Sequence, residues 1–197
     1  MTARTAVPVR IVGAGLLGAS LGHALAALGV DVVLADASRS QLSLAVDYGA
    51  GRHAAPGDAP GIVVVAVPPD ATAAVVAAEL AAWPDATVTD VASVKSGIVA
   101  ELRAAGADVS RYVGSHPMAG RERGGAISAR GDIFLGRPWV LAAPAEAGSE
   151  RIWAVENLAA DAGALPIIMS ASEHDAAVAL VSHVPQLVAS LLAARLT

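Results

Sequence analysis

The sequence has 197 residues, of which 55% are hydrophobic and 3% aromatic, and its formal net charge is −5 at pH 7. An acidic chain with few aromatic residues lacks the basic surface and stacking platforms of nucleic-acid-binding proteins, so we expect no nucleic-acid partner. The absence of cysteine excludes disulfides, thiolate zinc sites and cysteine nucleophiles, and we predict no metal site.

The sequence shows no targeting or membrane-spanning signal. Pro8 and Arg10 interrupt the apolar residues near the N-terminus, so this segment does not resemble a secretory signal. The longest strongly apolar run, residues 62–67, is too short to cross a bilayer. We therefore expect a soluble cytoplasmic protein with no membrane partner.

Short β-branched runs alternate with longer stretches rich in alanine and leucine. The runs predict seven strands, at residues 9–12, 30–35, 62–67, 86–89, 111–113, 139–142 and 165–169. The stretches between them predict helices, including residues 16–28, 71–82 and 96–105. Because the runs are apolar on both faces and alternate with helices, they predict a Rossmann-like, doubly wound, mainly parallel α/β sheet.

A glycine motif follows the first predicted strand and begins the first predicted helix. Gly13 permits a tight turn, Gly15 lets the backbone approach a pyrophosphate, and Gly18 lets the helix pack closely on the strand. The helix N-terminus offers N–H groups and partial positive charge to phosphates. With Asp36 at the end of the second strand, the pattern strongly predicts a dinucleotide site.

Asp36 would accept hydrogen bonds from the adenosine ribose and repel a 2′-phosphate, so we expect NAD as the cofactor. Arg39 could soften that repulsion, which leaves NADP possible. The turn at Val67 and Pro68 is either a cofactor contact or only a strand terminator. The predicted cofactor contacts in this part of the sequence are Gly13, Gly15, Leu16, Leu17, Gly18, Asp36, Val67 and Pro68.

Two further segments, residues 90–95 and 114–120, each follow a predicted strand and should lie on the same edge as the glycine turn. The second contains His116, held between a glycine and a proline. The usual pKa of an imidazole, near 6.5, suits a proton acceptor at neutral pH. We predict that His116 is such a residue.

The sequence at this point resembles the prephenate and arogenate dehydrogenase family. The matching segments are residues 12–21, 66–68, 90–95, 114–122, 136–139 and 182–185, in family order. The His-Pro-Met-Ala-Gly segment followed by Arg-Glu is the specific one. The resemblance implies oxidative decarboxylation of an anionic cyclohexadienol, with hydride transfer to the nicotinamide and aromatisation of the ring.

The resemblance also implies roles for single residues. His116 would polarise the ring hydroxyl, and Ser93 would be its hydrogen-bonding partner beside the nicotinamide. Ser115 and His183 would contact the substrate. Apart from the resemblance, Arg121 follows the histidine segment and could either hold a substrate carboxylate or belong to a solvated charged loop. His183 could instead fix its helix, and Lys95 could either supply positive charge or face solvent. His23, His53 and His174 receive no role.

Relatives in this family continue into a helical domain that forms a homodimer and completes the substrate pocket, and we expect this chain to lack most of it. We predict a dinucleotide-binding domain at residues 1–170 and the first helix of the second domain at residues 171–197, kinked at Pro185. Either prephenate or arogenate could be the substrate.

Two other functions remain open. A β-hydroxyacid or imine dehydrogenase of the wider fold would depend on a later lysine, and residues 171–197 contain none. The other is a module that binds NAD without catalysis.

Overall fold

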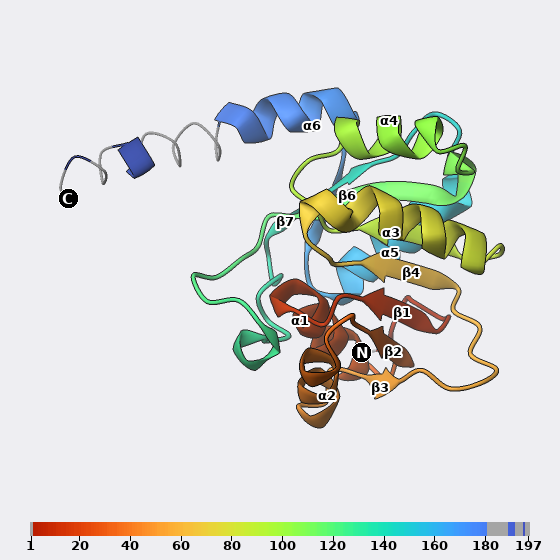
Figure 1. Ribbon diagram of the computed structural model, residues 1–197, viewed down its shortest axis with the longest axis vertical. Helices are drawn as coiled ribbons and strands as arrows, with labels where there is room; N and C mark the ends of the chain where they lie inside the picture. Colours follow the sequence, from red (N-terminus) through yellow and green to blue (C-terminus); the bar gives the residue numbers. More distant parts are fainter. Residues whose placement is uncertain (1, 181–188, 192–194, 196–197) are drawn as a thin grey trace.

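The computed structural model describes residues 2–180, 189–191 and 195. Within this part of the chain, one sheet of eight strands has the order β3-β2-β1-β4-β5-β6-β7-β8 (Figure 1). The strands are β1 (Val9–Val12), β2 (Val32–Ala35), β3 (Arg52–His53), β4 (Ile62–Val65), β5 (Thr87–Asp90), β6 (Tyr112–Pro117), β7 (Pro138–Ala142) and β8 (Leu165–Ile168). Every neighbouring pair is parallel except β6 with β7, which confirms the predicted Rossmann-like fold.

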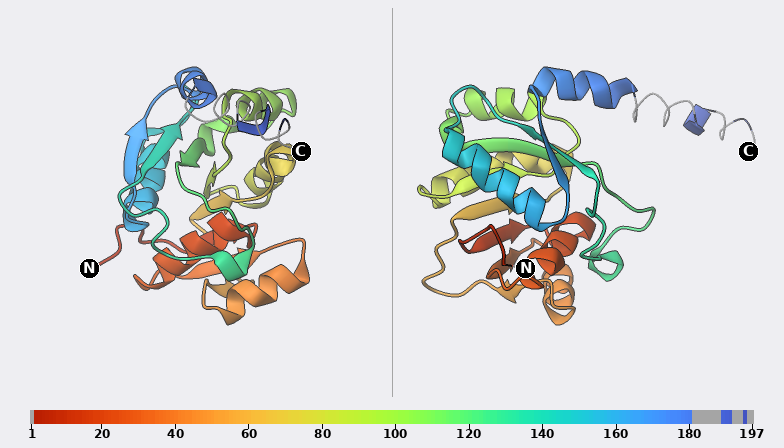
Figure 2. Two further views of the ribbon diagram at one scale, coloured as in Figure 1. Left: turned by 90° about the vertical axis from the view of Figure 1, so that its left-hand side faces the viewer. Right: turned by 180° about the vertical axis from the view of Figure 1, so that it is seen from behind.

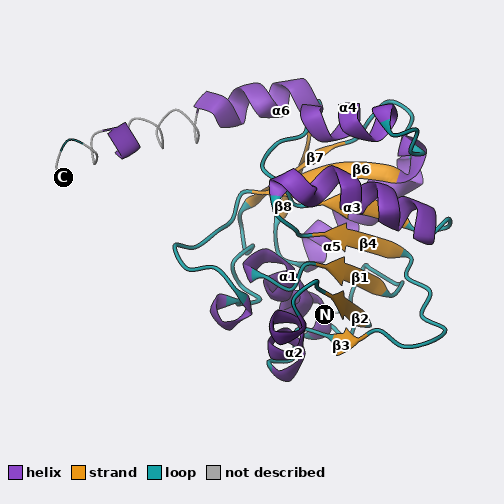
Figure 3. Cartoon of the chain, in the orientation of Figure 1, coloured by secondary structure: helices purple, strands orange, loops and turns teal. Residues whose placement is uncertain are grey.

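Helices cover both faces of the sheet (Figures 2 and 3). They are α1 (Leu16–Ala26), α2 (Arg39–Asp47), α3 (Pro69–Ala82), α4 (Ser96–Ala104), α5 (Ser149–Asp161) and α6 (Ala171–Val178). One buried cluster joins α1, α2 and α5 to one face of the sheet, and a second joins α3 and α4 to the other. Burial on both faces explains why the strands are apolar throughout.

The strand order places a crevice beside β1. The chain goes from β1 to β2 and β3 on one side and then crosses to β4 on the other. In open α/β sheets ligands bind at such a switch point, outside the carboxyl ends of the strands. Since β1, β4, β5 and β6 are mutually parallel, the turns after β1, β4 and β5 share one edge with the end of β6.

The fifth predicted strand required the largest correction. The sequence predicted a strand at residues 111–113 followed by a loop containing His116, but β6 runs on through Pro117. Its first two residues pair with β5, and residues 114–117 then pair antiparallel with β7. The antiparallel partner lies far along the chain, so no local pattern marked the extension. His116 is therefore held by a strand and not by a loop.

Smaller differences concern elements that the sequence did not single out, namely α2, α5 and the two-residue strand β3. The predicted helix at residues 171–197 begins at α6, and its second half, with His183 and Pro185, lies outside the described residues. None of the helices in the described part combines the length and apolar character that crossing a bilayer requires.

Candidate active site

The glycine turn has the geometry that the motif predicted. Gly13 has φ +104°, and an added Cβ would lie 2.3 Å from the Ala66 carbonyl oxygen. A Cβ on Gly18 would lie 1.9 Å from the Gly13 carbonyl oxygen, so α1 packs directly on the turn. A Cβ on Gly15 would meet no atom within 4 Å. Two glycines thus serve the fold, and the third leaves the start of α1 open to a ligand.

A cavity of about 350 Å³ lies beside this turn. It brings together five of the predicted cofactor residues: Gly13, Gly15, Asp36, Val67 and Pro68. Its other walls come from Val12, Ala37, Ala66, Ala71 and Val75. Leu16 and Leu17 form the first turn of α1, and no acidic residue lies in that turn. The cavity suits the apolar face of an adenosine, with backbone N–H groups available to its phosphates.

Asp36 also links the glycine turn to the segment that follows β2. Its carboxylate accepts hydrogen bonds from the Ala14 and Ser38 backbone nitrogens, both at 2.7 Å. A carboxylate has about four acceptor positions, so these two contacts leave capacity for ribose hydroxyls. Asp36 therefore holds the glycine turn to the end of β2 and remains suited to the predicted ribose contact.

His116 lies three strands from the glycine turn, about 14 Å along the sheet edge at the usual strand spacing. Its ring is half-buried, and its Nδ1 is 2.9 Å from Nε2 of His174 on α6. The two rings meet edge to face, with centroids 5.1 Å apart. His174 is 1% exposed, and its Nδ1 is 2.8 Å from Oδ1 of Asp175. Sequence analysis assigned no role to His174, because only the packing of α6 on α4 and β7 brings its ring against His116.

A buried ionic cluster lies under the same edge. Lys95 is fully buried, and its Nζ donates to Asp90 Oδ1 and, at 2.7 Å, to the Ser115 carbonyl oxygen. Tyr112 donates to the other Asp90 oxygen at 2.5 Å. Burial lowers the pKa of Lys95 against the opposing effect of the Asp90 charge, and burial with that charge raises the pKa of Tyr112.

The cluster overturns both interpretations of Lys95 that the sequence left open. Lys95 neither faces solvent nor points at a ligand, because its ammonium is paired inside the protein. It links the end of β5 to the backbone beside His116. Ser93 lies half-buried in the same turn between β5 and α4, on the edge where its predicted role requires it.

Ser115 occupies a different place from the one predicted. Its side chain is fully buried, and its hydroxyl donates to the Asp90 carbonyl oxygen at 2.6 Å. The Ser115 hydroxyl oxygen in turn accepts from the Trp139 indole at 2.9 Å and from the Thr89 hydroxyl at 3.2 Å. A hydroxyl so enclosed by β5 and β7 is a packing contact, which contradicts the prediction that it binds substrate.

Asp175 completes the contact between α6 and this edge. Its two oxygens accept from the Lys95 and Ser96 backbone nitrogens, each at 2.9 Å. Burial tends to raise the pKa of Asp175, but hydrogen bonds from Ser96, His174 and Lys95 together lower it to about 2. A carboxylate from α6 therefore caps the start of α4.

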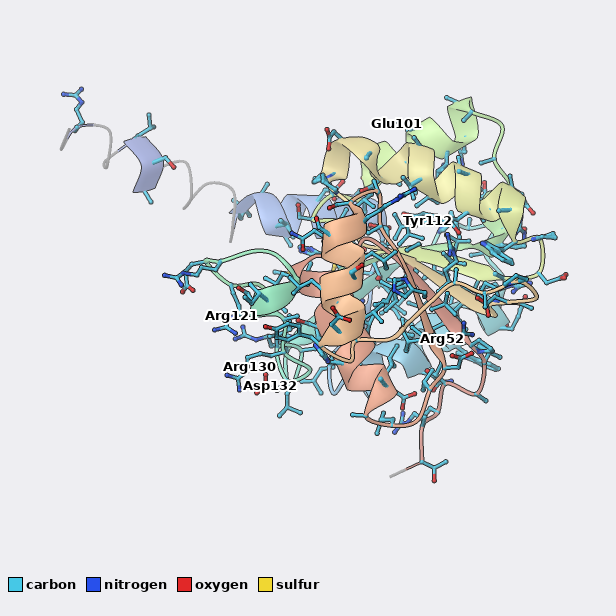
Figure 4. All side chains as sticks on the ribbon, turned by 60° about the horizontal axis from the view of Figure 1, so that its bottom comes forward. Arg52, Glu101, Tyr112, Arg121, Arg130 and Asp132 are labelled. Atoms are coloured by element: carbon cyan, nitrogen blue, oxygen red, sulfur yellow. The ribbon has the colours of Figure 1, made fainter. Side chains whose placement is uncertain are left out.

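The loop after β6 carries the predicted substrate arginine. Arg121 is exposed, and its Nη1 donates to the Ser128 carbonyl oxygen at 3.3 Å. Figure 4 shows it beside Arg130 and Asp132, which pair with each other at 3.0 Å. The loop encloses a cavity of about 440 Å³ with three arginines and one glutamate among its walls. This cavity is positively charged, which suits an anion. Among the described residues, no group of three or more acidic or histidine side chains could hold a metal ion.

Comparison with known protein families identifies the family of this chain. Residues 21–168 match the family model described as "Prephenate dehydrogenase, nucleotide-binding domain". The chain belongs to the prephenate dehydrogenase family. The matched range begins after the glycine turn, so the membership does not depend on a motif that many nucleotide-binding folds share. It confirms the predicted family, whose members are oxidoreductases.

Individual members of this family resemble the chain over nearly all its length. NovF of Streptomyces niveus, described as a probable prephenate dehydrogenase, is 41% identical over 194 residues, covering 98% of this chain and 53% of that protein. The structure of Aquifex aeolicus prephenate dehydrogenase with hydroxyphenyl propionate and NAD⁺ has a TM-score of 0.87 at 28% identity, covering 95% and 68%. Synechocystis arogenate dehydrogenase has a TM-score of 0.83 at 28% identity, with the same coverage. The chain spans about half the length of NovF.

Proposed function

We propose that this chain supplies the cofactor-binding and proton-accepting half of an NAD-dependent enzyme that converts prephenate to 4-hydroxyphenylpyruvate in tyrosine biosynthesis. The observation that carries the proposal is the position of His116, fixed by His174 on the same sheet edge as the glycine turn. The likeness to an Aquifex enzyme solved with NAD⁺ and a hydroxyphenyl ligand supports it.

The cofactor would lie along the carboxyl edge of the sheet. The N–H groups at the start of α1 would bind its pyrophosphate, Asp36 would bind the adenosine ribose, and Ser93 would contact the nicotinamide end. When bound, NAD supplies the hydride acceptor. The Asp36 carboxylate disfavours a 2′-phosphate, so NAD is favoured over NADP, with Arg39 as the residue that could moderate this preference.

His116 would handle the proton of the substrate hydroxyl. It accepts this proton while a hydride leaves the carbon that bears the hydroxyl. The carboxylate then departs as carbon dioxide, its bonding electrons make the ring aromatic, and His116 returns the proton to the oxygen. Aromatisation supplies much of the driving force, so orientation and one proton acceptor are the main demands on the protein. Arg121 would hold a substrate carboxylate, and His183, the other predicted substrate contact, lies outside the described residues.

Arogenate is the second candidate substrate, supported by the likeness to Synechocystis arogenate dehydrogenase. It differs from prephenate in carrying an amino acid side chain in place of a keto acid. A different kind of candidate is a module that binds NAD without turnover, for which the cavity beside the glycine turn would be sufficient. The domain boundary near residue 170, the cytoplasmic location and a homodimer formed by longer relatives stay predictions.

The test is formation of NADH or NADPH, followed by absorbance, after prephenate or arogenate is added with NAD or NADP respectively. We expect prephenate with NAD to react fastest. The His116→Ala variant should lose turnover and keep NAD affinity, and His53→Ala on the remote strand β3 is the matched control. NAD binding with no turnover on either substrate would favour the binding module, and absence of NAD binding would remove the proposal.

A second experiment tests the cofactor choice. Replacing Asp36 by alanine removes the charge that repels a 2′-phosphate. We expect the ratio of NADP to NAD affinity to rise about tenfold or more, corresponding to about 1.4 kcal/mol. An unchanged ratio would mean that Asp36 does not lie beside the adenosine ribose.

A further inference from the structure

His116 is the first member of a hydrogen-bonded chain that continues through α6. Its Nδ1 is 2.9 Å from Nε2 of His174, and Nδ1 of His174 is 2.8 Å from Oδ1 of Asp175. His174 and Asp175 lie 58 and 59 residues beyond His116 in the sequence, so only the folded chain brings them to it. His174 is 1% exposed, and water therefore does not compete for its ring nitrogens.

Asp175, the last residue of this hydrogen-bonded series, has one protonation state at neutral pH. Asp175 accepts hydrogen bonds from two backbone nitrogens at the start of α4, which stabilise its ionised form. Those bonds hold its pKa at about 2 in spite of burial. At neutral pH the carboxylate is an acceptor only. Nδ1 of His174 must then be the donor in the contact between the two residues.

That donor fixes the remaining nitrogens in turn. A neutral His174 with its proton on Nδ1 has its lone pair on Nε2, which accepts from Nδ1 of His116. A neutral His116 with its proton on Nδ1 has Nε2 as its acceptor nitrogen. The assignment follows from the hydrogen-bond network, as histidine tautomers usually do.

We propose that His174 and Asp175 are positioning residues that hold His116 in the Nδ1–H tautomer, with Nε2 as the nitrogen that accepts the substrate's hydroxyl proton. The proposal rests on the proposed function for its catalytic meaning, but the tautomer itself is a property of the chain alone. When Nε2 takes the proton, Nδ1–H of the resulting imidazolium still donates to His174. The Asp175 charge at the far end of the chain stabilises that cation, and returning the proton to the oxygen restores the starting state.

The logic is that of a carboxylate orienting a catalytic histidine, with a second imidazole inserted between them. The buried cluster around Lys95 also holds His116 and Asp175 in their relative positions. Lys95 bonds through its Nζ to the Ser115 carbonyl and through its backbone nitrogen to Asp175. One residue therefore anchors both the strand that carries His116 and the carboxylate that orients it.

The first test reads the tautomers directly in the 197-residue chain labelled with ¹⁵N-histidine. Long-range proton–nitrogen NMR correlations should show protonated Nδ1 and unprotonated Nε2 for both His116 and His174 near neutral pH. His174→Phe keeps a ring against His116 but removes its acceptor, and Asp175→Ala removes the carboxylate. In both variants we expect the single His116 tautomer to give way to a mixture.

The control is Glu173→Ala, on the same turn of α6. Glu173 forms the capping box with Ser170 but does not belong to the chain that ends at His116. This substitution should weaken the N-terminal cap of α6 and leave the His116 tautomer unchanged. Protonated Nε2 on His116 in the wild type would overturn the proposal. A His116 tautomer unchanged in both His174→Phe and Asp175→Ala would do the same.

The second test is turnover of prephenate with NAD. His174→Phe should lower kcat about 100-fold, the lower end of what a positioned proton acceptor contributes, with KM little changed. An unchanged kcat in His174→Phe would remove the catalytic meaning of the tautomer. If the wild type shows the expected tautomers but no turnover, the proposed function fails while the orienting role of His174 and Asp175 stands.

Discussion

The two ends of the candidate site are built in opposite ways. At β1 the cofactor end depends on glycines, because their lack of a side chain lets α1, Ala66 and the turn come into direct contact. At β6 the proposed catalytic end depends on polar and charged side chains that are mostly buried, contributed by β5, β6, α6 and the residue before α4. The glycines of the first construction all lie within residues 13–18, whereas hydrogen bonds of the second join residues up to 80 positions apart. Local constructions leave a motif, whereas distributed ones leave only isolated polar residues.

The largest expected effect is at the charged end. Asp90→Ala would leave the buried Lys95 ammonium without its carboxylate, which typically destabilises a protein by about 3–5 kcal/mol. Urea unfolding followed by circular dichroism would measure the change. Asp85→Ala, in the exposed turn before β5, is the control and should change stability by less than about 0.5 kcal/mol. A cost below about 1 kcal/mol at Asp90 would mean that this end is not held by charge.

The packed glycine of the other end should give the next largest effect. Gly18→Ala places a Cβ 1.9 Å from the Gly13 carbonyl oxygen, and relieving that overlap should cost about 2–3 kcal/mol. Gly97→Ala is the matched control, because Gly97 is also helical and its added Cβ meets nothing within 4 Å. That substitution should stabilise the chain by roughly 0.5–1 kcal/mol. Equal effects of the two in thermal unfolding would contradict the close packing of α1 on the turn.

Substitution of Gly15 should affect cofactor binding without affecting stability. Gly15→Ala meets no atom of the protein, so stability should stay within about 0.5 kcal/mol of the wild type. The added methyl group would occupy the space where the pyrophosphate approaches, and NAD affinity should fall about tenfold, or 1.4 kcal/mol. Fluorescence titration with NADH measures this. Unchanged affinity would show that the dinucleotide does not cross this turn.

The smallest expected effect concerns acid pH. The folded-state pKa of Asp175, about 2, lies below its unfolded value of about 4, so its stabilising effect is complete above pH 4 and disappears as pH falls toward 2. For this half-buried carboxylate the effect should be about 1 kcal/mol after solvent screening. The stability difference between wild type and Asp175→Asn should therefore shrink as pH falls through that window. A difference that is independent of pH would assign the effect to packing.

Much of the fold could be predicted because its signals are local. The runs of β-branched residues marked seven strands, and the glycine motif marked the cofactor turn. The capping box of Ser170 and Glu173 is a local signal that could also have fixed the start of α6. By contrast, α2 and α5 are mixed in polarity and were not singled out. Asp90 was read as part of a motif, without any sign that its carboxylate is buried.

The sequence by itself determined the Rossmann-like sheet, the glycine turn and the family. Each of these follows from residues close together in the chain, whose backbone conformation and polarity limit what the segment can form. Only the tertiary structure decided that Lys95 is buried, that Ser115 is enclosed and that His174 meets His116. A side chain's hydrogen-bond partners depend on which distant segment packs on it, and sequence spacing does not contain that information.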